Sequence, residues 1–205
     1  MAEQNVSLDG QLGTIVSWKV PNEIGLDELR LALTDAGLDA GLAADMAPRH
    51  ALTRAMRGLS KNRVIRKLKI SSGNLTFQMN RVQVAGGGHI DYPHETDVTL
   101  DLTTQVVSCP DPVIERAATD LLNEHIGKRQ TGDLTRLIQK IFDSRAADLI
   151  PIREQGGAYF VPDRSVDLVD SMRTLLNKIG GNLRSFDIRL GSADTSASVA
   201  ESMVE

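Results

Sequence analysis

The chain has 205 residues, of which 41% are apolar, and its formal net charge is −4. These values are typical of a globular protein and exclude collagen-like, low-complexity and membrane-embedded chains. Aromatic residues make up only 3%, so we expect an aliphatic core and no surface on which one base after another stacks. A single cysteine, Cys109, excludes an intrachain disulfide and a multi-cysteine metal site. With no signal-peptide pattern at the N-terminus and no apolar run long enough to span a bilayer, we expect a cytoplasmic protein.

Strands and helices alternate in the first half of the chain. Apolar residues at every second position over 12–20 predict a strand that ends at Pro21. Helical spacing predicts one helix over 26–36, closed by Gly37, and a second from Pro48 to Leu59. The rest of this half is predicted as two strands joined by a turn, over residues 63–70 and 75–84, a flexible glycine-rich loop over 85–88 and a half-buried strand over 96–107.

The segment Cys109-Pro110-Asp111-Pro112 breaks the pattern and predicts a domain boundary. After it we expect two helices, a hairpin, a helix and a strand, over residues 113–126, 133–145, 149–162, 165–179 and 183–190. The last residues are small and polar, which favours disorder. We therefore predict an N-terminal domain over 1–109, a C-terminal domain over 110–190 and a disordered tail over 191–205.

The predicted fold class is α/β of the α+β type, with helix pairs and antiparallel β-hairpins. Short turns at 71–74 and 154–157 join neighbouring strands, and only antiparallel strands can be joined so directly. A doubly wound parallel sheet is therefore excluded. Both halves contain helices and a hairpin, in an order that resembles a winged-helix unit.

Charge is unevenly distributed along the chain. Between Met46 and Ile90 there is no acidic residue, although the whole chain has 27. The same stretch carries nine of the chain's 23 basic residues: Arg49, Arg54, Arg57, Lys61, Arg63, Arg66, Lys67, Lys69 and Arg81. Such a separation is typical of an interaction face.

Helical spacing gathers part of this charge on one side of the second predicted helix. His50, Arg54, Arg57 and Lys61 are spaced i, i+4, i+7 and i+11, and the apolar residues of that helix lie on the opposite side. The basic helix and the hairpin after it predict a non-enzymatic protein that binds the backbone of DNA or RNA. The lack of aromatic residues favours duplex or backbone contact over base stacking.

Two other functions remain open. The same basic face could bind an acidic protein partner, as in an assembly or inhibitor protein, or could pair with the acidic half of its own chain. The third hypothesis is a metal-dependent enzyme that uses the loop from His89 to Glu95, which holds two histidines and two carboxylates. That spacing matches no zinc motif, so we expect no metal, no cofactor and no catalytic residue. Cys109 has no base nearby in sequence and is predicted to be a buried structural thiol.

The segment from Ile152 to Pro162 combines an arginine, two glycines and an aromatic-Val-Pro run before a helix. It resembles an uncharacterised family of phage and mobile-element proteins, in which these features recur. The resemblance extends loosely over the second half of the chain. It implies a viral or mobile-element origin and a location in the host cytoplasm, and it implies no activity.

Overall fold

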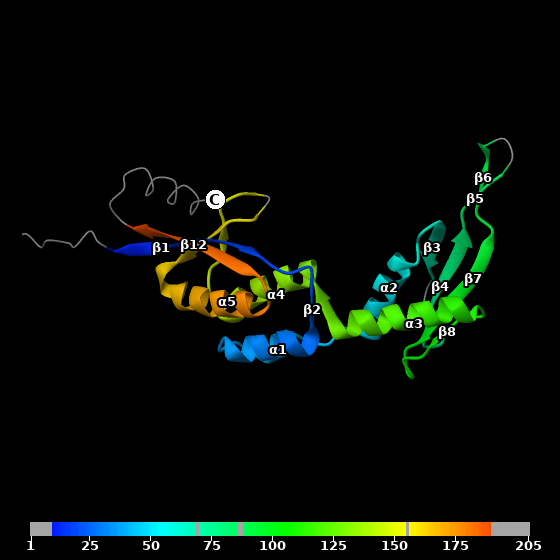
Figure 1. Cartoon of the computed structure of the whole chain (residues 1–205), viewed down its shortest axis with the longest axis horizontal. Helices are drawn as coiled ribbons and strands as arrows, with labels where there is room; N and C mark the ends of the chain where they lie inside the picture. The colour runs from blue at the N-terminus through cyan, green and yellow to red at the C-terminus, as the bar shows by residue number, and fades with distance from the viewer. Residues whose placement is uncertain (1–9, 69, 86–87, 155, 190–205) are drawn as a thin grey trace, which may run out of the picture. The chain divides into compact units, whose positions relative to one another are not determined.

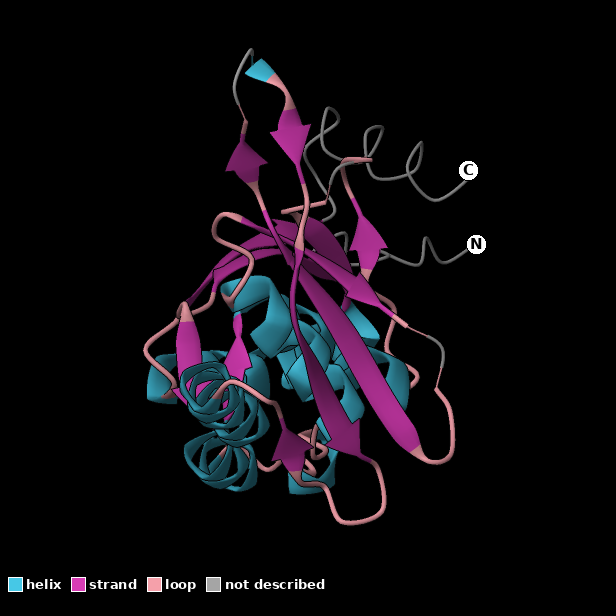
Figure 2. Ribbon diagram, turned by 90° about the vertical axis from the view of Figure 1, so that its right-hand side faces the viewer, coloured by secondary structure: helices cyan, strands magenta, loops and turns pink. Residues whose placement is uncertain are grey.

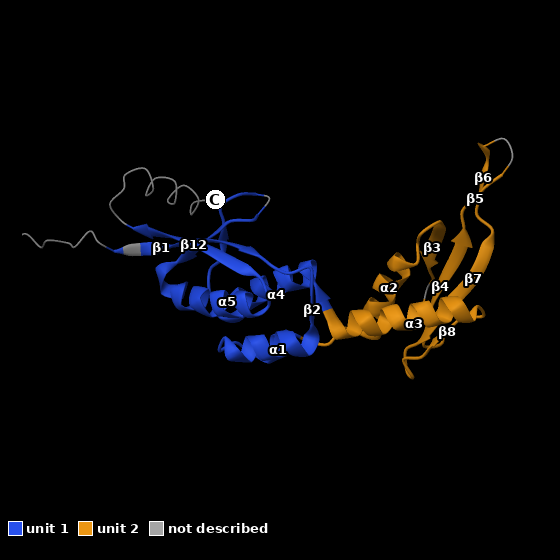
Figure 3. Cartoon of the chain, viewed as in Figure 1, with its two compact units in different colours: residues 1–43, 129–205 blue, residues 44–128 orange. Residues whose placement is uncertain are grey.

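The structure is a computed structural model that describes residues 10–68, 70–85, 88–154 and 156–189 (Figure 1). The chain forms two compact units (Figure 3). Unit 1 consists of Met1–Ala43 and Arg129–Glu205, and unit 2 consists of Ala44–Lys128. Unit 2 is therefore inserted in the sequence of unit 1.

Unit 1 is built on a four-stranded antiparallel sheet. Its strands, in spatial order, are β10 (Ile150–Pro151), β11 (Tyr159–Pro162), β1 (Gln11–Lys19) and β12 (Asn182–Arg189). The first strand of the chain thus lies between two strands that follow it by about 150 residues. A separate two-stranded sheet joins β2 (Glu23–Gly25) to β9 (Lys128–Gln130).

Three helices supply most of the core of unit 1: α1 (Leu26–Asp35), α4 (Thr131–Ser144) and α5 (Val166–Lys178). Two short 3₁₀ helices, Ala40–Leu42 and Asp163–Ser165, connect these elements. At the border of the core the Trp18 and Tyr159 rings stack with their centres 4.7 Å apart. The core is otherwise mostly aliphatic, as the composition predicted.

Unit 2 has two layers, a four-stranded antiparallel sheet and two helices (Figures 1 and 2). The sheet order is β3 (Arg63–Lys67), β4 (Asn74–Arg81), β7 (His94–Asp101) and β8 (Val107–Ser108). Helices α2 (Pro48–Gly58) and α3 (Pro112–Gly127) share one core with alternate residues of β4 and β7, so both cover the same face of the sheet. A short hairpin, β5 (Gln83–Val84) and β6 (Ile90–Asp91), extends from β4 and β7.

The predicted α+β class is confirmed, and every strand pair in the two four-stranded sheets is antiparallel. The domain boundary predicted after residue 109 differs from the division seen here, which falls at 43/44 and 128/129. The break at Pro110 is the start of α3, because Asp111 caps this helix by accepting hydrogen bonds from the N–H groups of Val113 (2.9 Å) and Ile114 (3.2 Å). Since α3 buries Ile114, Ala118 and Leu122 in the core of unit 2, the chain does not change domain at this point. The two helices of unit 2 are separated by the sheet and do not form the consecutive pair of a winged-helix unit.

The strand predicted over 96–107 is shorter in the structure. It ends at Asp101, whose carboxylate accepts hydrogen bonds from the N–H groups of Thr103 (2.7 Å) and Thr104 (3.0 Å). This side-chain turn reverses the chain, so that β8 pairs back onto β7. Val107 is consequently buried, whereas Val106 is 59% exposed. The predicted disordered tail, and Gly86 and Gly87 of the predicted glycine loop, lie outside the described residues.

No helix within the described part of the chain is both long and apolar enough to cross a membrane.

Candidate functional site

The basic stretch predicted from sequence lies in unit 2, on α2, β3 and β4. α2 begins at Pro48 and buries Ala51, Leu52, Ala55 and Met56, which turns its polar positions outward. Arg49, His50 and Arg57 are exposed and Arg54 is half-buried. Lys61 is exposed in the loop between α2 and β3. Of the four residues predicted to share a helical face, His50, Arg54 and Arg57 lie on α2, whereas Lys61 lies beyond its end, because the helix stops at Gly58.

β3 is an edge strand of the unit 2 sheet. Just beyond its two ends, Leu68 N–H donates to the Thr76 carbonyl and Val82 N–H donates to the Asn62 carbonyl, both at 2.9 Å. In an antiparallel pair only alternate residues bond to the neighbouring strand, so the backbone groups of Ile65 face away from β4. The edge of the sheet thus combines outward-facing backbone groups with basic side chains.

The side chains of β3 alternate between the two faces of the sheet. Ile65 and Lys67 lie opposite the buried Met79 and Phe77 of β4, and so point to the face that the helices cover. Arg66 is exposed on the other face. Arg63 and Lys67 share one face of β3, whereas Lys69 lies outside the described residues.

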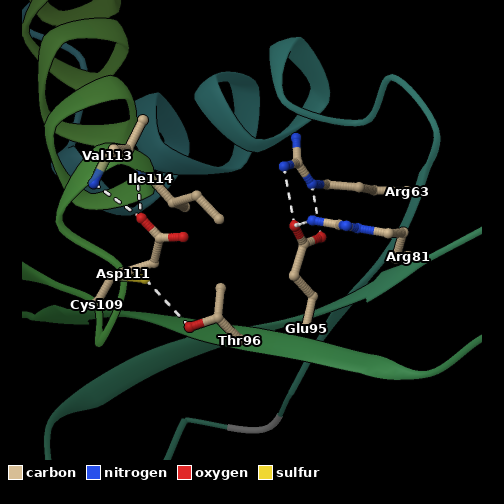
Figure 4. Close-up of polar contacts among 8 residues, drawn as sticks. All are labelled: Arg63, Arg81, Glu95, Thr96, Cys109, Asp111, Val113 and Ile114. Atoms are coloured by element: carbon tan, nitrogen blue, oxygen red, sulfur yellow. Dashed lines mark hydrogen bonds and ion pairs between the residues drawn. The ribbon is translucent and has the colours of Figure 1, made fainter.

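Two of the nine predicted residues form an ion cluster within unit 2 (Figure 4). Arg63 Nε and Nη2 donate to the two oxygens of Glu95 at 2.7 and 3.0 Å, and Arg81 Nη2 donates to Glu95 Oε1 at 2.8 Å. The Glu95 side chain is only 11% exposed. The hydrogen bonds from Arg63 and then Arg81 lower the pKa of Glu95 to about 2, although burial opposes this, and Glu95 in turn raises the pKa of Arg63.

The ion cluster divides the predicted basic set. Arg63 and Arg81 both bind Glu95. The hypothesis that the basic residues pair with acidic residues of their own chain therefore holds for these two. Four other residues form what we call the basic edge, which follows the end of α2, the next loop and β3: Arg57, Lys61, Arg66 and Lys67. None of the four has an acidic neighbour within four positions in sequence, because the whole stretch is acid-free.

A pocket of about 250 Å³ opens between α2 and β3 beside the basic edge. Its apolar lining comes from Met56, Ile65 and Phe77, and its cations are Arg57 and Lys67. Two hydroxyl residues, Thr53 and Ser60, complete the lining. Sequence reasoning did not find this pocket, because its residues come from α2, the loop after it, β3 and β4, whose packing is set by the tertiary fold.

The histidine loop does not assemble a metal-binding group in the structure. His94 Nε2 lies 3.0 Å from Asp97, His89 Nε2 lies 3.2 Å from Asp91, and Glu95 is held by the two arginines. Within the described ranges, no group of three or more His, Cys, Asp or Glu side chains is placed to hold a metal ion.

Cys109 is half-buried and its sulfur lies 3.3 Å from Thr96 Oγ1 (Figure 4). Its backbone N–H donates to Glu115 Oε2 at 2.9 Å. These contacts join the end of β8 to β7 and α3. Cys109 was predicted to be buried and is half-buried in the structure.

Comparison with known proteins yields a match to one family model. No curated protein and no solved structure matches the chain. A model described as a family of unknown function, DUF6744, matches residues 11–203. This match covers both units and nearly the whole chain, so the chain belongs to the DUF6744 family.

Proposed function

We propose that this protein binds nucleic acid without catalysing a reaction, and that the basic edge of unit 2 contacts the phosphate backbone. The observation that carries the proposal is the acid-free stretch from Met46 to Ile90, in which Arg57, Lys61, Arg66 and Lys67 remain exposed around one sheet edge. Cations on such an edge attract phosphates regardless of base sequence.

The exposed acidic residues of unit 2 include Asp120 and Glu124 on α3 and Asp91 on β6. These elements contribute no residue to the basic edge, which lies wholly within the acid-free stretch.

A binding titration tests this proposal. Fluorescence anisotropy of labelled single-stranded DNA, duplex DNA and RNA should show binding at low salt, because electrostatic attraction is then least screened. Changing Arg57, Lys61 and Arg66 together to alanine should weaken binding of all sequences about equally. Each lost phosphate contact should also reduce the slope of log affinity against log salt by roughly 0.7–0.9.

A matched control separates local contact from net charge. Lys140 on α4 and Arg184 and Arg189 on β12 are exposed basic residues of unit 1, so their triple alanine variant removes the same charge elsewhere. Binding by this variant should change much less. If the unmodified protein binds none of the three nucleic acids at low salt, or if both triple variants lose binding equally, the basic edge is not the interface.

A second candidate is an acidic protein partner, as in an assembly or inhibitor protein. Apolar side chains lie among the cations: Val64 is 44% exposed, Leu68 38% and Ile70 51%. Mixed apolar and basic surface suits a protein interface better than a phosphate backbone. An unchanged affinity for DNA in the basic-edge variant, together with loss of a protein complex, would favour this candidate.

A phage or mobile-element origin belongs to the same proposal. It is supported by the resemblance of the segment Ile152–Pro162, which follows β10 and ends with β11. Nucleic-acid binding and a host-cytoplasmic location are compatible with that origin.

A further inference from the structure

We infer that β3 accepts an extended acidic segment of a partner protein as an additional antiparallel strand. The inference goes beyond the proposed contact between cations and phosphates, because it uses the backbone of the strand as well as its side chains. β3 lies at one edge of the unit 2 sheet, and among the described strands it pairs with β4 alone. All strand pairs of this sheet are antiparallel, so an antiparallel addition would continue its pattern.

The backbone of β3 directs donors and acceptors away from the sheet. The hydrogen bonds just beyond its two ends show that the even-numbered positions bond to β4. The N–H and carbonyl groups of Ile65 and Lys67 therefore point outward, with the spacing that a further strand would use. Arg63 N–H, by contrast, donates to the Ser60 carbonyl at 3.0 Å and closes the turn before the strand. The open part of the edge thus begins after Arg63 N–H.

Exposed apolar side chains accompany these backbone groups. Val64 is 44% and Leu68 38% exposed, and Arg66 lies between them on the same face. Side chains directly opposite each other on neighbouring antiparallel strands pack together. Val64 and Leu68 would gain such neighbours from an added strand, whereas a phosphate backbone would leave them in water.

The charges of β3 determine which strand can pair with it. Two copies of β3 that paired antiparallel about Ile65 would place Arg63 opposite Lys67, and pairing about Arg66 would place that residue opposite its own copy. Like charges directly opposite each other are destabilising, and charged edges of this kind prevent a sheet from pairing with itself. An acidic strand meets the same cations favourably. The partner is therefore an acidic segment and not a second copy of this chain.

The pocket beside β3 offers a place for one acidic side chain of the added strand. Alternate side chains of that strand would lie on the face of the sheet that α2 covers, where the pocket of about 250 Å³ opens. Arg57, Lys67 and the hydroxyl of Ser60 contribute to its lining. Met56 and Phe77, which also border it, are only 2% and 3% exposed. The accessible lining is thus mainly polar and basic, which suits a carboxylate.

The test uses a labelled peptide of about eight residues, an ordinary strand length, in which glutamate and valine alternate. In the inferred arrangement its glutamates lie on the side of Arg57 and Lys67, and its valines lie on the side of Val64 and Leu68. Fluorescence anisotropy with the full chain, in the absence of nucleic acid, should show saturable binding.

Two methylated forms of this peptide separate strand addition from charge attraction. Both keep the same sequence and charge, and one carries N-methyl groups on its glutamates and the other on its valines. In an antiparallel pair, the residues opposite Ile65 and Lys67 direct their N–H groups toward β3. These residues are the glutamates, so methylation of the glutamates should abolish binding, whereas methylation of the valines should leave it largely intact.

A proline variant assigns the effect to β3. Ile65→Pro removes an N–H group that points away from β4, and an edge strand accepts proline at such a position. The matched control is Ile65→Val, which shortens the side chain and keeps the N–H group. Ile65→Pro should weaken peptide binding about tenfold relative to Ile65→Val. Neither variant changes charge, so any affinity of the unmodified protein for nucleic acid should remain in both.

The remaining outcomes separate this inference from the proposed function. Equal binding of the two methylated peptides, or equal peptide affinity of Ile65→Pro and Ile65→Val, would overturn strand addition. If Ile65→Pro does not fold, the methylated peptides decide the question with the unmodified protein. Peptide binding without any binding of nucleic acid would refute the proposed function and support the inference, whereas nucleic-acid binding without peptide binding would do the reverse.

Discussion

Glu95 determines which of the basic residues remain available to a ligand. Its carboxylate lies between Arg63 of β3 and Arg81 of β4 and binds both (Figure 4). The sequence predicted all nine basic residues as one site because Glu95 is 32 positions from Arg63 and lies outside the acid-free stretch. Only the pairing of β4 with β7 brings it into contact. Local charge density was therefore predictable from sequence, whereas the internal compensation of two charges was not.

The ion cluster should stabilise unit 2 in a pH-dependent way. We expect Glu95→Gln to lower the free energy of unfolding by about 1–3 kcal/mol at neutral pH, since it leaves two close arginines without their carboxylate. The pKa of Glu95 is lowered from 4.5 to about 2 in the folded protein. Its contribution is thus fully present above pH 4.5 and is lost as the pH falls through the range from 4.5 to about 2.

Urea denaturation at a series of pH values measures this contribution. The stability difference between the unmodified protein and Glu95→Gln should be constant from neutral pH to about pH 5 and then shrink towards pH 2, where the carboxyl group becomes protonated in both folded and unfolded states. Arg81→Lys is a useful companion variant, because it keeps the charge and alters the geometry of one bond only. A difference between unmodified protein and Glu95→Gln that does not vary with pH would show that the charge of Glu95 is not what matters.

Most single elements were predictable from local patterns. The strand over 12–20 corresponds to β1, and the helices ended by Gly37 and begun by Pro48 correspond to α1 and α2. Gly37 has a φ of 70°, and backbone hydrogen bonds close the end of α1 around it, which is the geometry that glycine permits. The partners of β1 could not be predicted, because β11 and β12 are separated from β1 in sequence by the whole of unit 2.

β1 depends on a glycine where it approaches β11. A Cβ atom at Gly13 would lie 2.3 Å from the Val161 carbonyl oxygen and 2.7 Å from the Phe160 ring, so one strand would have to move. Because β1 is paired on both sides, we expect Gly13→Ala to lower the free energy of unfolding of unit 1 by about 1–3 kcal/mol. The measurement is the midpoint of urea unfolding followed by circular dichroism.

Gly132 on α4 provides the control for this substitution. A Cβ atom there meets nothing within 4 Å, and alanine is a better helix former than glycine by up to about 1 kcal/mol. Gly132→Ala should therefore leave the midpoint unchanged or raise it. A Gly13→Ala protein as stable as the Gly132→Ala protein would mean that β1 can shift away from β11 without cost.

At the scale of the whole molecule, the chain forms two cores that do not follow the order of the sequence. The core of unit 2 consists of buried residues from Ala51 to Leu122, all within one continuous segment. The core of unit 1 combines residues up to Ala43 with residues from Leu134 onward. Reading along the sequence therefore favours one boundary, at the break near Pro110, whereas the packing requires two.

Fragments of the chain distinguish these two divisions. The segment Ala44–Lys128 contains the whole core of unit 2, and domains of this size commonly fold alone. We expect it to unfold cooperatively on heating and to give dispersed amide signals in an NMR spectrum. The fragment 1–109, which the sequence predicted to be a domain, lacks α3 and both sheet neighbours of β1. It should expose apolar surface and show no cooperative transition.

The same fragments assign the binding activity to a unit. If the basic edge binds nucleic acid, Ala44–Lys128 should retain the salt-dependent affinity of the full chain, because all four residues of the basic edge lie within it. Removing unit 1 also removes much of the chain's negative charge, so the affinity at low salt should rise slightly. A folded Ala44–Lys128 that binds no strand to which the full chain binds would place the interface in unit 1. Cooperative unfolding of 1–109 would instead restore the boundary near Pro110.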